Sequence, residues 1–310
     1  MMQVADAFPP AWIAVDWGTT ALRVWAMGAG GTVLAAVASD QGMGALAPQA
    51  FEPALLALIE PWLAGAGNPV PVVACGMVGA RQGWREAAYR AVPCTPLGGP
   101  LLAVAPHDPR FTLHIVAGLS QAEPADVMRG EEVQIAGYLA THPGFEGTLC
   151  LPGTHSKWAT IRAGRVSSFQ TCMTGELFAL LSTTSVLRHA LGGPGWDDAA
   201  FLDASAEALA APETLSTRLF AIRAASLLAG QSPATARARL SGLLIGAELA
   251  ATRALWQGPA VAIVGAGQLA SHYAAALAAQ GRVAVSADAS DVTLRGLAAA
   301  YAILQQETPA

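Results

Sequence analysis

Short apolar runs and segments of helical spacing alternate along the chain, and they form two similar halves. The first half opens with apolar runs that predict three strands joined by glycine-containing turns, at residues 12–15, 22–27 and 32–38. Three further runs repeat this opening in the second half, at residues 148–151, 158–161 and 166–171. The repetition predicts two α/β domains, 1–145 and 146–310, that begin with the same three-stranded unit.

Longer segments predict the remaining elements of each half. In the first half we expect a helix at 53–64, strands at 70–74 and 112–116, and a helix at 131–141. In the second half we expect a helix at 174–191, with Thr174 as its N-cap and Glu176 in its first turn. Helical patterns dominate residues 199–256, and a strand, helix, strand and helix then follow at 261–264, 265–280, 283–287 and 291–305.

Composition excludes several classes of protein. Although 53% of the 310 residues are hydrophobic, glycines and polar residues interrupt the longest weakly charged stretch, 258–281, so no membrane span is expected. A formal charge of −5 without a basic block argues against a nucleic-acid partner. The N-terminus has no basic segment, so we expect no signal peptide. Four cysteines without a CxxC pair predict reduced thiols and a cytoplasmic setting.

Two turns rich in glycine and threonine, at residues 16–20 and 152–156, each follow the first strand of a half. Glycine lets backbone N–H groups approach a ligand closely, and threonine hydroxyls add donors for phosphate oxygens. A carboxylate such as that of Asp16 needs a cation between itself and a phosphate, and Mg²⁺ suits that position. The alternative is a pair of ordinary hairpin turns. The matched positions favour two turns that hold a polyphosphate from both sides.

The segment Gly265-Ala266-Gly267-Gln268-Leu269-Ala270 has the G-x-G-x-x-A pattern of a dinucleotide site, and Asp288 follows the next strand. On its own this pattern favours an NAD-dependent oxidoreductase. Its position argues against that function, because only 22 residues follow Asp288, too few for the further strands of a Rossmann domain. A buried strand-to-helix turn, or a turn that supports adenine or ribose, is the alternative. The chain has no P-loop motif.

Six segments in order resemble the 2-dehydro-3-deoxygalactonokinase family, within the actin/hexokinase/Hsp70-type ATPase superfamily. They lie at residues 14–23, 76–79 with 83–84, 127–132, 152–158, 173–177 and 241–248. The resemblance implies an α/β fold of two ribonuclease-H-like domains flanking a cleft for nucleotide and substrate. It also implies ATP-dependent phosphorylation of 2-dehydro-3-deoxy-D-galactonate at its 6-hydroxyl, with the nucleotide held mainly by the second domain and the sugar acid by the first.

The motifs assign a first set of roles to individual residues. We expect Asp16 to face Mg²⁺. The residues expected around the phosphates are Gly18, Thr19, Thr20, Gly153, Thr154, His155 and Lys157. Those expected on the adenosine side are Gly265, Gly267 and Gln268. A solvated strand end is the alternative for His155 and Lys157.

The acceptor hydroxyl needs a carboxylate as general base, and the substrate's own carboxylate needs a cation. The superfamily resemblance places the base near the start of the helix before the second phosphate turn, which favours Glu131 or Glu132, with Asp126 third. Those glutamates could instead only favour the helix dipole. The residues expected to contact the sugar acid are Arg81, Gln82, Trp84 and Arg129.

Two other functions stay open at this point. One is the NAD-dependent oxidoreductase, and the other is a non-catalytic ATP-binding regulator on the same fold. Binding of Mg-ATP rather than NAD(H) separates the first from a kinase, and turnover that depends on a sugar acid separates the second. The expected partners are ATP and a small sugar acid, without nucleic acid or membrane, and a homodimer is compatible with the sequence.

Overall fold

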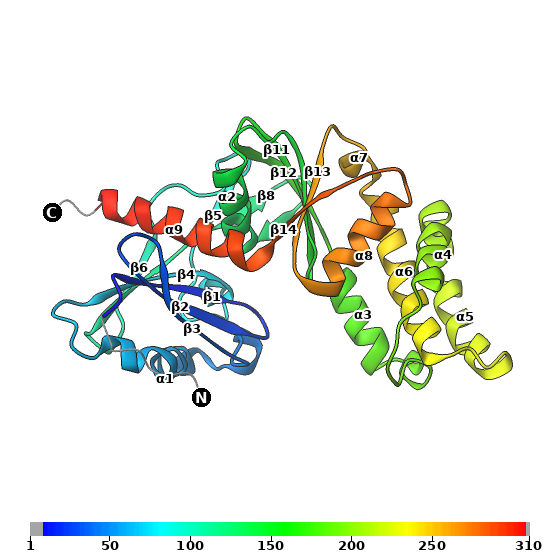
Figure 1. Ribbon diagram of the computed structural model, residues 1–310, viewed down its shortest axis with the longest axis horizontal. Helices are drawn as coiled ribbons and strands as arrows, with labels where there is room; N and C mark the ends of the chain where they lie inside the picture. The colour runs from blue at the N-terminus through cyan, green and yellow to red at the C-terminus, as the bar shows by residue number, and fades with distance from the viewer. Residues whose placement is uncertain (1–8, 308–310) are drawn as a thin grey trace. The chain divides into compact units, whose positions relative to one another are not determined.

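The computed structural model describes residues 9–307 (Figure 1). They fall into two compact units, which are described separately. The described part of unit 1 comprises residues 9–144, 164–166 and 289–307, and unit 2 comprises 145–163 and 167–288. The expected absence of a signal peptide concerns an N-terminus whose first eight residues lie outside the described range.

Unit 1 contains a six-stranded sheet of order β3-β2-β1-β4-β7-β6. Its strands are β1 (Trp12–Trp17), β2 (Leu22–Met27), β3 (Val33–Ser39), β4 (Val70–Gly76), β6 (Leu102–Val104) and β7 (Phe111–Ile115). Strand β1 pairs antiparallel with β2 and parallel with β4, and β4 pairs parallel with β7. The side chains of β1 are buried except for the half-buried Asp16, which explains why its sequence is apolar up to that residue.

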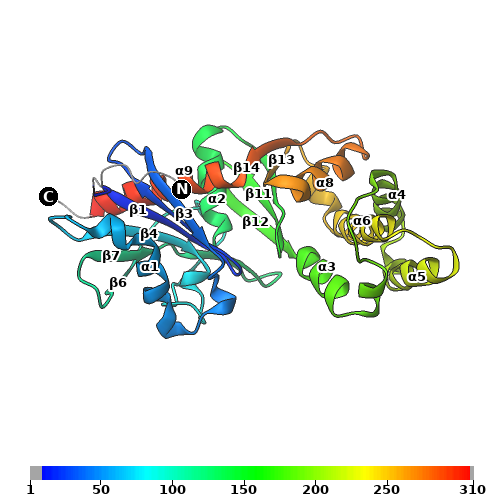
Figure 2. The same cartoon turned by 60° about the horizontal axis from the view of Figure 1, so that its bottom comes forward.

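Helices cover both faces of this sheet. On one face α1 (Phe51–Leu63) contributes to a core with Ile13 and Val72. On the other face α9 (Ala289–Glu307) packs with α2 (Glu131–Thr141), and both cover a cluster that contains Trp12 (Figures 1 and 2). Two glycines allow the close contact between these helices. A Cβ on Gly137 would lie 1.8 Å from the Val292 carbonyl oxygen, and one on Gly296 would lie 2.0 Å from that of Val133.

The placement of α9 differs from the domain boundary expected from sequence. The second domain was expected to run from 146 to 310, but helix α9 belongs to unit 1. The physical reason is the apolar face of α9, which includes Leu297 and Ala300 and completes the core over β1 and β4. Tyr301 stacks on Trp12, with ring centroids 4.5 Å apart.

Unit 1 also has a three-stranded sheet of order β5-β8-β9 that the sequence did not predict. These strands are β5 (Tyr89–Ala91), β8 (Gly118–Gln121) and β9 (Asp126–Met128). They are three or four residues long and partly exposed, so neither apolar alternation nor length distinguishes them from loops.

Unit 2 has a five-stranded sheet of order β12-β11-β10-β13-β14. The strands are β10 (Gly147–Leu151), β11 (Ser156–Arg162), β12 (Arg165–Cys172), β13 (Val261–Gly265) and β14 (Val285–Asp288). Strand β10 pairs antiparallel with β11 and parallel with β13. Both sheets therefore place a three-strand antiparallel opening beside parallel strands, the ribonuclease-H-like arrangement expected for each half. Strand β14 ends the sheet, so β13 does not begin a Rossmann domain.

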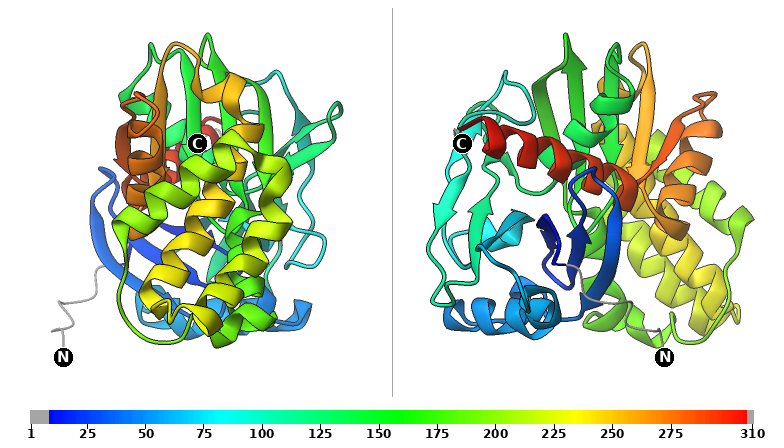
Figure 3. Two further views of the ribbon diagram at one scale, coloured as in Figure 1. Left: turned by 90° about the vertical axis from the view of Figure 1, so that its right-hand side faces the viewer. Right: turned by 60° about the vertical axis from the view of Figure 1, so that its left-hand side comes forward.

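The helices of unit 2 are α3 (Thr174–Thr183), α4 (Asp198–Ala210), α5 (Leu215–Leu228), α6 (Pro233–Ala251), α7 (Arg253–Trp256) and α8 (Gly267–Ala278). Helix α6 packs against α3, α4 and α5, as Figure 3 shows. Glycines again set the distance between helices: a Cβ on Gly246 of α6 would lie 2.2 Å from the Ser205 carbonyl oxygen of α4. No helix within residues 9–307 is both long and apolar enough to cross a bilayer.

The start and end of α3 correct two expectations. The helix expected at 174–191 ends at Thr183, and a short 3-10 helix, Val186–His189, follows. The hydroxyls of Thr184 and Ser185 donate to carbonyls of the preceding turn, and the Ser185 hydroxyl also caps the 3-10 helix. Thr174 is not the N-cap, because Met173 holds that position and the Thr174 hydroxyl donates to Glu248.

Candidate functional site

The first of the two turns predicted to bind phosphate, residues 16–20 (the first phosphate turn), lies between β1 and β2 and is supported by a neighbouring loop. The Gly18 N–H donates to the Ala21 carbonyl at 2.8 Å, and the Gly44 N–H donates to the Thr19 carbonyl at 2.9 Å. A Cβ on Gly42 would lie 2.4 Å from the Thr19 carbonyl oxygen, so only glycine permits this approach. Thr19 and Thr20 are exposed. The turn thus presents two hydroxyls from a backbone held in place by hydrogen bonds.

Asp16 lies near the end of β1, where a single cation engages it. Its carboxylate forms an ion pair with Arg23, the residue directly opposite on β2. The second guanidinium nitrogen of Arg23 donates to the Ser290 hydroxyl at 2.9 Å. The Asp16 side chain is 14% exposed. Arg23 was not assigned a role from sequence, although the hairpin register alone would have placed it across from Asp16.

Glu132 is a buried carboxyl at the start of α2. Its Oε2 accepts the Gly130 N–H at 2.7 Å, whereas its Oε1 is buried and has no hydrogen-bond partner. Burial, and secondarily the negative charge of Glu131, raise the pKa of Glu132 to about 8. Gly130, at φ 104°, brings this helix start close to β4, because its Cβ would lie 3.3 Å from the Gly76 Cα.

The other two acidic candidates differ from Glu132 in their surroundings. Glu131 Oε2 accepts the Arg129 N–H at 3.1 Å in the first turn of α2. Asp126 lies on β9, where its Oδ1 accepts the Val127 N–H at 2.8 Å. Of these three carboxyls, only Glu132 is fully buried.

Arg129 is the buried cation beside these carboxyls, with 9% of its surface exposed. Its Nη2 donates to the Ala87 carbonyl at 2.7 Å, and its guanidinium lies 4.3 Å from the centroid of the Tyr89 ring. Its Nε and Nη1 are buried and have no hydrogen-bond partner. Buried donors of this kind are rarely left unsatisfied in proteins, so Arg129 is suited to receive an anionic ligand.

The remaining candidates for sugar-acid contacts lie in less favourable positions. The Arg81 side chain is 79% exposed and forms an ion pair with Glu86 at 3.4 Å, and Gln82 is exposed. Trp84 packs edge-on against Trp17, with ring centroids 6.5 Å apart, as part of the unit 1 core.

The second turn predicted to bind phosphate, residues 152–156 (the second phosphate turn), lies in unit 2 against the start of α3. A Cβ on Gly175 would lie 2.2 Å from the Gly153 carbonyl oxygen, and the Glu176 N–H donates to the Thr154 carbonyl at 2.9 Å. His155 Nε2 lies 2.5 Å from Glu176 Oε2. The turn and the N-terminus of α3, where backbone N–H groups favour anions, are therefore adjacent.

Lys157 differs from the other residues of this motif because it is only 4% exposed. Its Nζ donates to the His155 carbonyl at 3.5 Å, a long hydrogen bond, from within β11. The solvated strand end considered for Lys157 is therefore excluded. The His155 side chain, by contrast, is 46% exposed.

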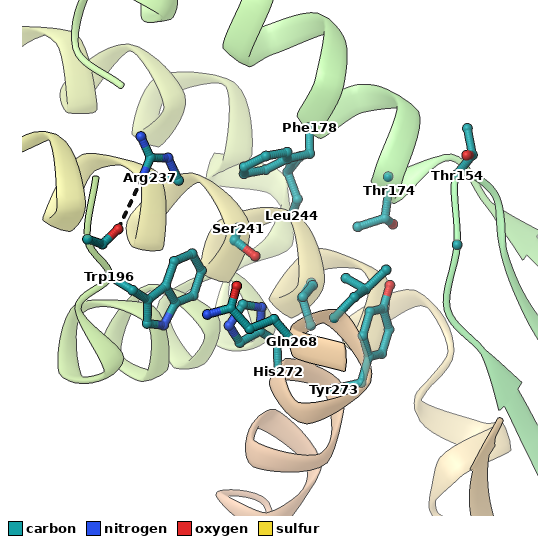
Figure 4. A pocket seen from close by; sticks show the side chains of 15 residues that line it. Thr154, Thr174, Phe178, Trp196, Arg237, Ser241, Leu244, Gln268, His272 and Tyr273 are labelled. Atoms are coloured by element: carbon teal, nitrogen blue, oxygen red, sulfur yellow. Dashed lines mark hydrogen bonds between the residues drawn. The ribbon is translucent and has the colours of Figure 1, made fainter. Parts of the chain in front are cut away.

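A cavity of about 690 Å³ adjoins the second phosphate turn, and all of its lining residues belong to unit 2 (Figure 4). Gly153 and Thr154 line it together with residues from α3, α6 and α8. Opposite them, Trp196 stacks on His272 with ring centroids 4.1 Å apart. The cavity is thus bounded by the Gly153–Thr154 turn and by the flat surface of two stacked aromatic rings.

Of the three adenosine-side candidates, Gln268 lines this cavity, whereas Gly265 and Gly267 form the turn before it. Gly267 has φ +61°, and a Cβ on Gly265 would lie 3.0 Å from the Ala270 Cβ. These glycines therefore allow α8 to start directly after β13 and to present Gln268 to the cavity. Gly267 is needed for its positive φ, and Gly265 is needed for its close packing against Ala270.

Sequence reasoning missed most of the cavity lining. Arg237 supports one wall by donating to the carbonyls of Leu191, Gly193 and Gly195, which precede Trp196. His272 lies four residues after Gln268 on α8, so helical spacing could have placed it on the same face. Trp196 and Arg237 had no such signal, because they come from a loop and a helix far apart in sequence.

The residues around Asp16 show whether the expected Mg²⁺ ion would find suitable oxygen ligands there. Within the described residues, no group of three or more His, Cys, Asp or Glu side chains could hold a metal ion. Mg²⁺ in nucleotide enzymes needs fewer protein ligands, commonly one or two carboxylates beside phosphates and water. Asp16 offers such a carboxylate, with Arg23 on one oxygen and the Cys75 Sγ 3.8 Å from the other. The residues fit Mg²⁺ held mainly by phosphate and water.

The chain is similar to known proteins over nearly its whole length. The family model of 2-keto-3-deoxy-galactonokinase matches residues 16–300. A Rhizobium meliloti (strain 1021) protein, named a probable 2-dehydro-3-deoxygalactonokinase, is 39% identical over 93% of this chain and 95% of its own. The 2-dehydro-3-deoxygalactonokinase of Escherichia coli (strain K12) is 34% identical over 78% of this chain and 80% of its own.

A solved structure agrees with these similarities. A crystal structure from Sinorhizobium meliloti, named for the same activity, superposes with a TM-score of 0.87 at 39% identity, covering 94% of this chain and 96% of that one. Both the sequence and the fold thus match the same group of proteins. The chain belongs to the 2-keto-3-deoxy-galactonokinase family.

Proposed function

We propose that the chain transfers the γ-phosphoryl group of ATP to the 6-hydroxyl of 2-dehydro-3-deoxy-D-galactonate. Family membership supports the reaction and the substrate. The structural observation that carries the proposal is the cavity of unit 2, where Gly153 and Thr154 lie at one side and the stacked Trp196 and His272 at another. Hydrogen-bond donors for phosphate oxygens and a flat aromatic surface in one cavity suit a purine nucleotide.

For the nucleotide, we assign the binding position of the adenine ring to the region of Trp196, His272 and Gln268. The phosphates then extend toward Thr154 and the N-terminus of α3, where the helix dipole favours negative charge. Arg237 acts on the cavity wall, because its guanidinium is engaged by three backbone carbonyls of the loop before Trp196.

In unit 1, we assign the turn of Gly18, Thr19 and Thr20 to the transferring phosphate. Mg²⁺, when bound, would supply charge neutralisation between the phosphate oxygens. Asp16 would hold that cation through the oxygen that Arg23 leaves available, and the ion pair with Arg23 would fix the direction of the carboxylate.

For the acceptor, we assign Glu132 as general base and Arg129 as the partner of the substrate carboxylate. The unpaired Oε1 of Glu132 is an acceptor that could take the proton of the 6-hydroxyl as the phosphoryl group arrives. The two unpaired nitrogens of Arg129 match a bidentate carboxylate. Glu131, Asp126, Arg81, Gln82 and Trp84 are secondary candidates.

The proposed setting is the cytoplasm, which four cysteines without a disulfide support. The test is an assay that detects ADP across a series of 2-keto-3-deoxy sugar acids, together with calorimetry of Mg-ATP and NAD(H). We expect turnover that depends on the galactonate derivative, and we expect heat of binding for Mg-ATP but not for NAD(H). Binding of NAD(H) alone would exclude the kinase, and ATP hydrolysis that no sugar acid stimulates would favour a regulator.

A further inference from the structure

We propose that Glu248 is a positioning residue that holds the second phosphate turn and the aromatic side of the cavity in the arrangement that binds ATP. This inference rests on the proposed function for the identity of the ligand. Glu248 itself does not line the cavity, so its effect on binding must act through its neighbours.

Glu248 is a buried acceptor that three separate elements share. It lies on α6 and is 4% exposed. Its Oε1 accepts the indole N–H of Trp158 on β11 at 2.6 Å, and its Oε2 accepts the Tyr273 hydroxyl of α8 at 2.7 Å. The Thr174 hydroxyl, at the start of α3, also donates to Oε2. Strand β11, helix α8 and helix α3 thus meet at one carboxylate.

The donors of this carboxylate are tied directly to the cavity. Thr174 and Tyr273 line it, on different elements. The next residue after Thr174 is Gly175, whose Cα hydrogen lies against the Gly153 carbonyl of the phosphate turn, as the absence of room for a Cβ requires. Tyr273 also bonds the Ser156 hydroxyl at 2.8 Å, and Ser156 follows His155 at the end of that turn. A shift at Glu248 therefore moves both sides of the cavity.

The chemistry of a carboxylate suits this position better than that of an amide. A carboxylate accepts on both oxygens, and here both oxygens receive donors. A glutamine has one acceptor oxygen, so it can satisfy Trp158 only if its NH₂ group faces the hydroxyls of Thr174 and Tyr273. Those hydroxyls would then have to turn and donate elsewhere. Burial raises the pKa of Glu248 while the donors oppose that rise.

Two tryptophans that hydrogen-bond to the same helix, α6, provide the test and its matched control. Trp158 donates its indole N–H to the Glu248 side chain, and Trp256 donates its own to the Leu249 backbone carbonyl at 2.7 Å. Both indoles are buried in the same cluster, and neither lines the cavity. Trp158→Phe and Trp256→Phe each remove one indole hydrogen bond to α6, but only the first disturbs the shared carboxylate.

The experiment measures the dissociation constant of a non-hydrolysable ATP analogue by calorimetry, and KM for ATP and for the sugar acid, for the wild type, Glu248→Gln, Trp158→Phe and Trp256→Phe. We expect Glu248→Gln and Trp158→Phe to weaken nucleotide binding about tenfold while KM for the sugar acid stays within about twofold. Trp256→Phe should lower the melting temperature but leave nucleotide affinity within about twofold.

The outcomes separate this inference from the proposed function. Equal nucleotide affinity in Trp158→Phe and Trp256→Phe, with wild-type affinity in Glu248→Gln, would overturn the positioning role. A wild-type chain that binds the analogue but phosphorylates no sugar acid would overturn only the proposed function. If Glu248→Gln does not fold, the comparison of the two tryptophan variants still decides, and a wild-type chain that binds no nucleotide would overturn both proposals.

Discussion

Asp16 and Arg23 are direct cross-strand partners in the β1–β2 hairpin, and their side chains form an ion pair beside the first phosphate turn. The turn between them is short, so both ends of the ion pair are fixed by the same local backbone. Arg23 is held a second time by the Ser290 hydroxyl of α9. The hairpin thus supplies a carboxylate of fixed direction at the place where the proposed function needs one.

The first prediction concerns Asp16→Asn. We expect kcat to fall at least about 100-fold, because an aligned negative charge is lost next to the transferring phosphate. Stability should change by less than about 1 kcal/mol, since the partly exposed ion pair contributes little and Arg23 keeps its bond to Ser290. Steady-state kinetics and thermal unfolding measure both. Asp291→Asn, which breaks the exposed ion pair with Arg295 in the same unit, is the control. An Asp16→Asn enzyme with wild-type turnover would remove Asp16 from the site.

The second prediction separates the two glutamates of α2. Glu132→Gln should lower kcat by about 10²- to 10⁴-fold, the range of a general base, whereas Glu131→Gln should lower it less than about fivefold. The buried position and unpaired Oε1 of Glu132 motivate the difference. Single-turnover kinetics with saturating ATP measure the chemical step. Loss of activity only in Glu131→Gln would assign the base to the other residue.

The third prediction is a pH dependence of kcat. A general base acts when it is ionised, and the pKa of Glu132 is raised to about 8, so kcat should rise with pH through that value. The charge of Glu131 contributes to that rise in pKa, so Glu131→Gln should move the rising limb to lower pH. A flat profile between about pH 7 and pH 9 would contradict this assignment.

The raised pKa of Glu132 also affects stability. Whereas kcat should rise with pH, the stability of the fold should fall. A carboxyl whose pKa is raised by folding is favoured in its protonated form, so its contribution is complete below the unfolded pKa and is lost as pH rises through about 8. The free energy of unfolding of the wild type should therefore fall over this range. Glu132→Gln should show a weaker fall, which urea unfolding at several pH values can measure.

The fourth prediction concerns the substrate carboxylate. Arg129→Met should raise KM for the sugar acid about 10- to 100-fold and leave KM for ATP unchanged, because a charge-assisted contact is lost. Arg81→Met is the matched comparison, since Arg81 is exposed in an ion pair with Glu86, and we expect less than about a threefold effect. A larger effect for Arg81→Met than for Arg129→Met would reverse the two assignments.

The fifth prediction concerns the base side of the unit 2 cavity. Trp196→Ala should raise KM for ATP about 10- to 100-fold, as expected for loss of a base–aromatic stack, and Trp196→Phe should recover most of the affinity. KM for the sugar acid should not change. Equal affinities for ATP in the wild type and Trp196→Ala would place the base elsewhere.

Local sequence patterns predicted the elements that local forces form. The strands before the two phosphate turns, and helix α2 at its bounds Glu131–Thr141, follow from apolar runs, glycine turns and helical spacing. Local patterns missed β5, β8 and β9, because each is short and partly exposed. They also missed that α9 packs in unit 1, because an amphipathic helix does not specify which sheet it covers.

The candidate site divides in the same way. Residues of the two Gly-Thr turns could be named from sequence, since each turn is a continuous motif. The cavity could not, because Trp196 and Arg237 approach each other only through the packing of a loop on α6. Glu248 lies in segment 241–248, one of the six that resemble the family. The positioning role proposed for it could not be predicted from sequence, because its three hydrogen-bond partners come from β11, α3 and α8.

The measurement that tests the central proposal most directly is the product formed from Mg-ATP and 2-dehydro-3-deoxy-D-galactonate, followed by ADP release and by phosphorus NMR of the sugar acid. We predict equal amounts of ADP and of a phosphate monoester at the 6-position, with turnover lost in Glu132→Gln. ADP formation at the same rate without the sugar acid, or a phosphate at any other position, would contradict it.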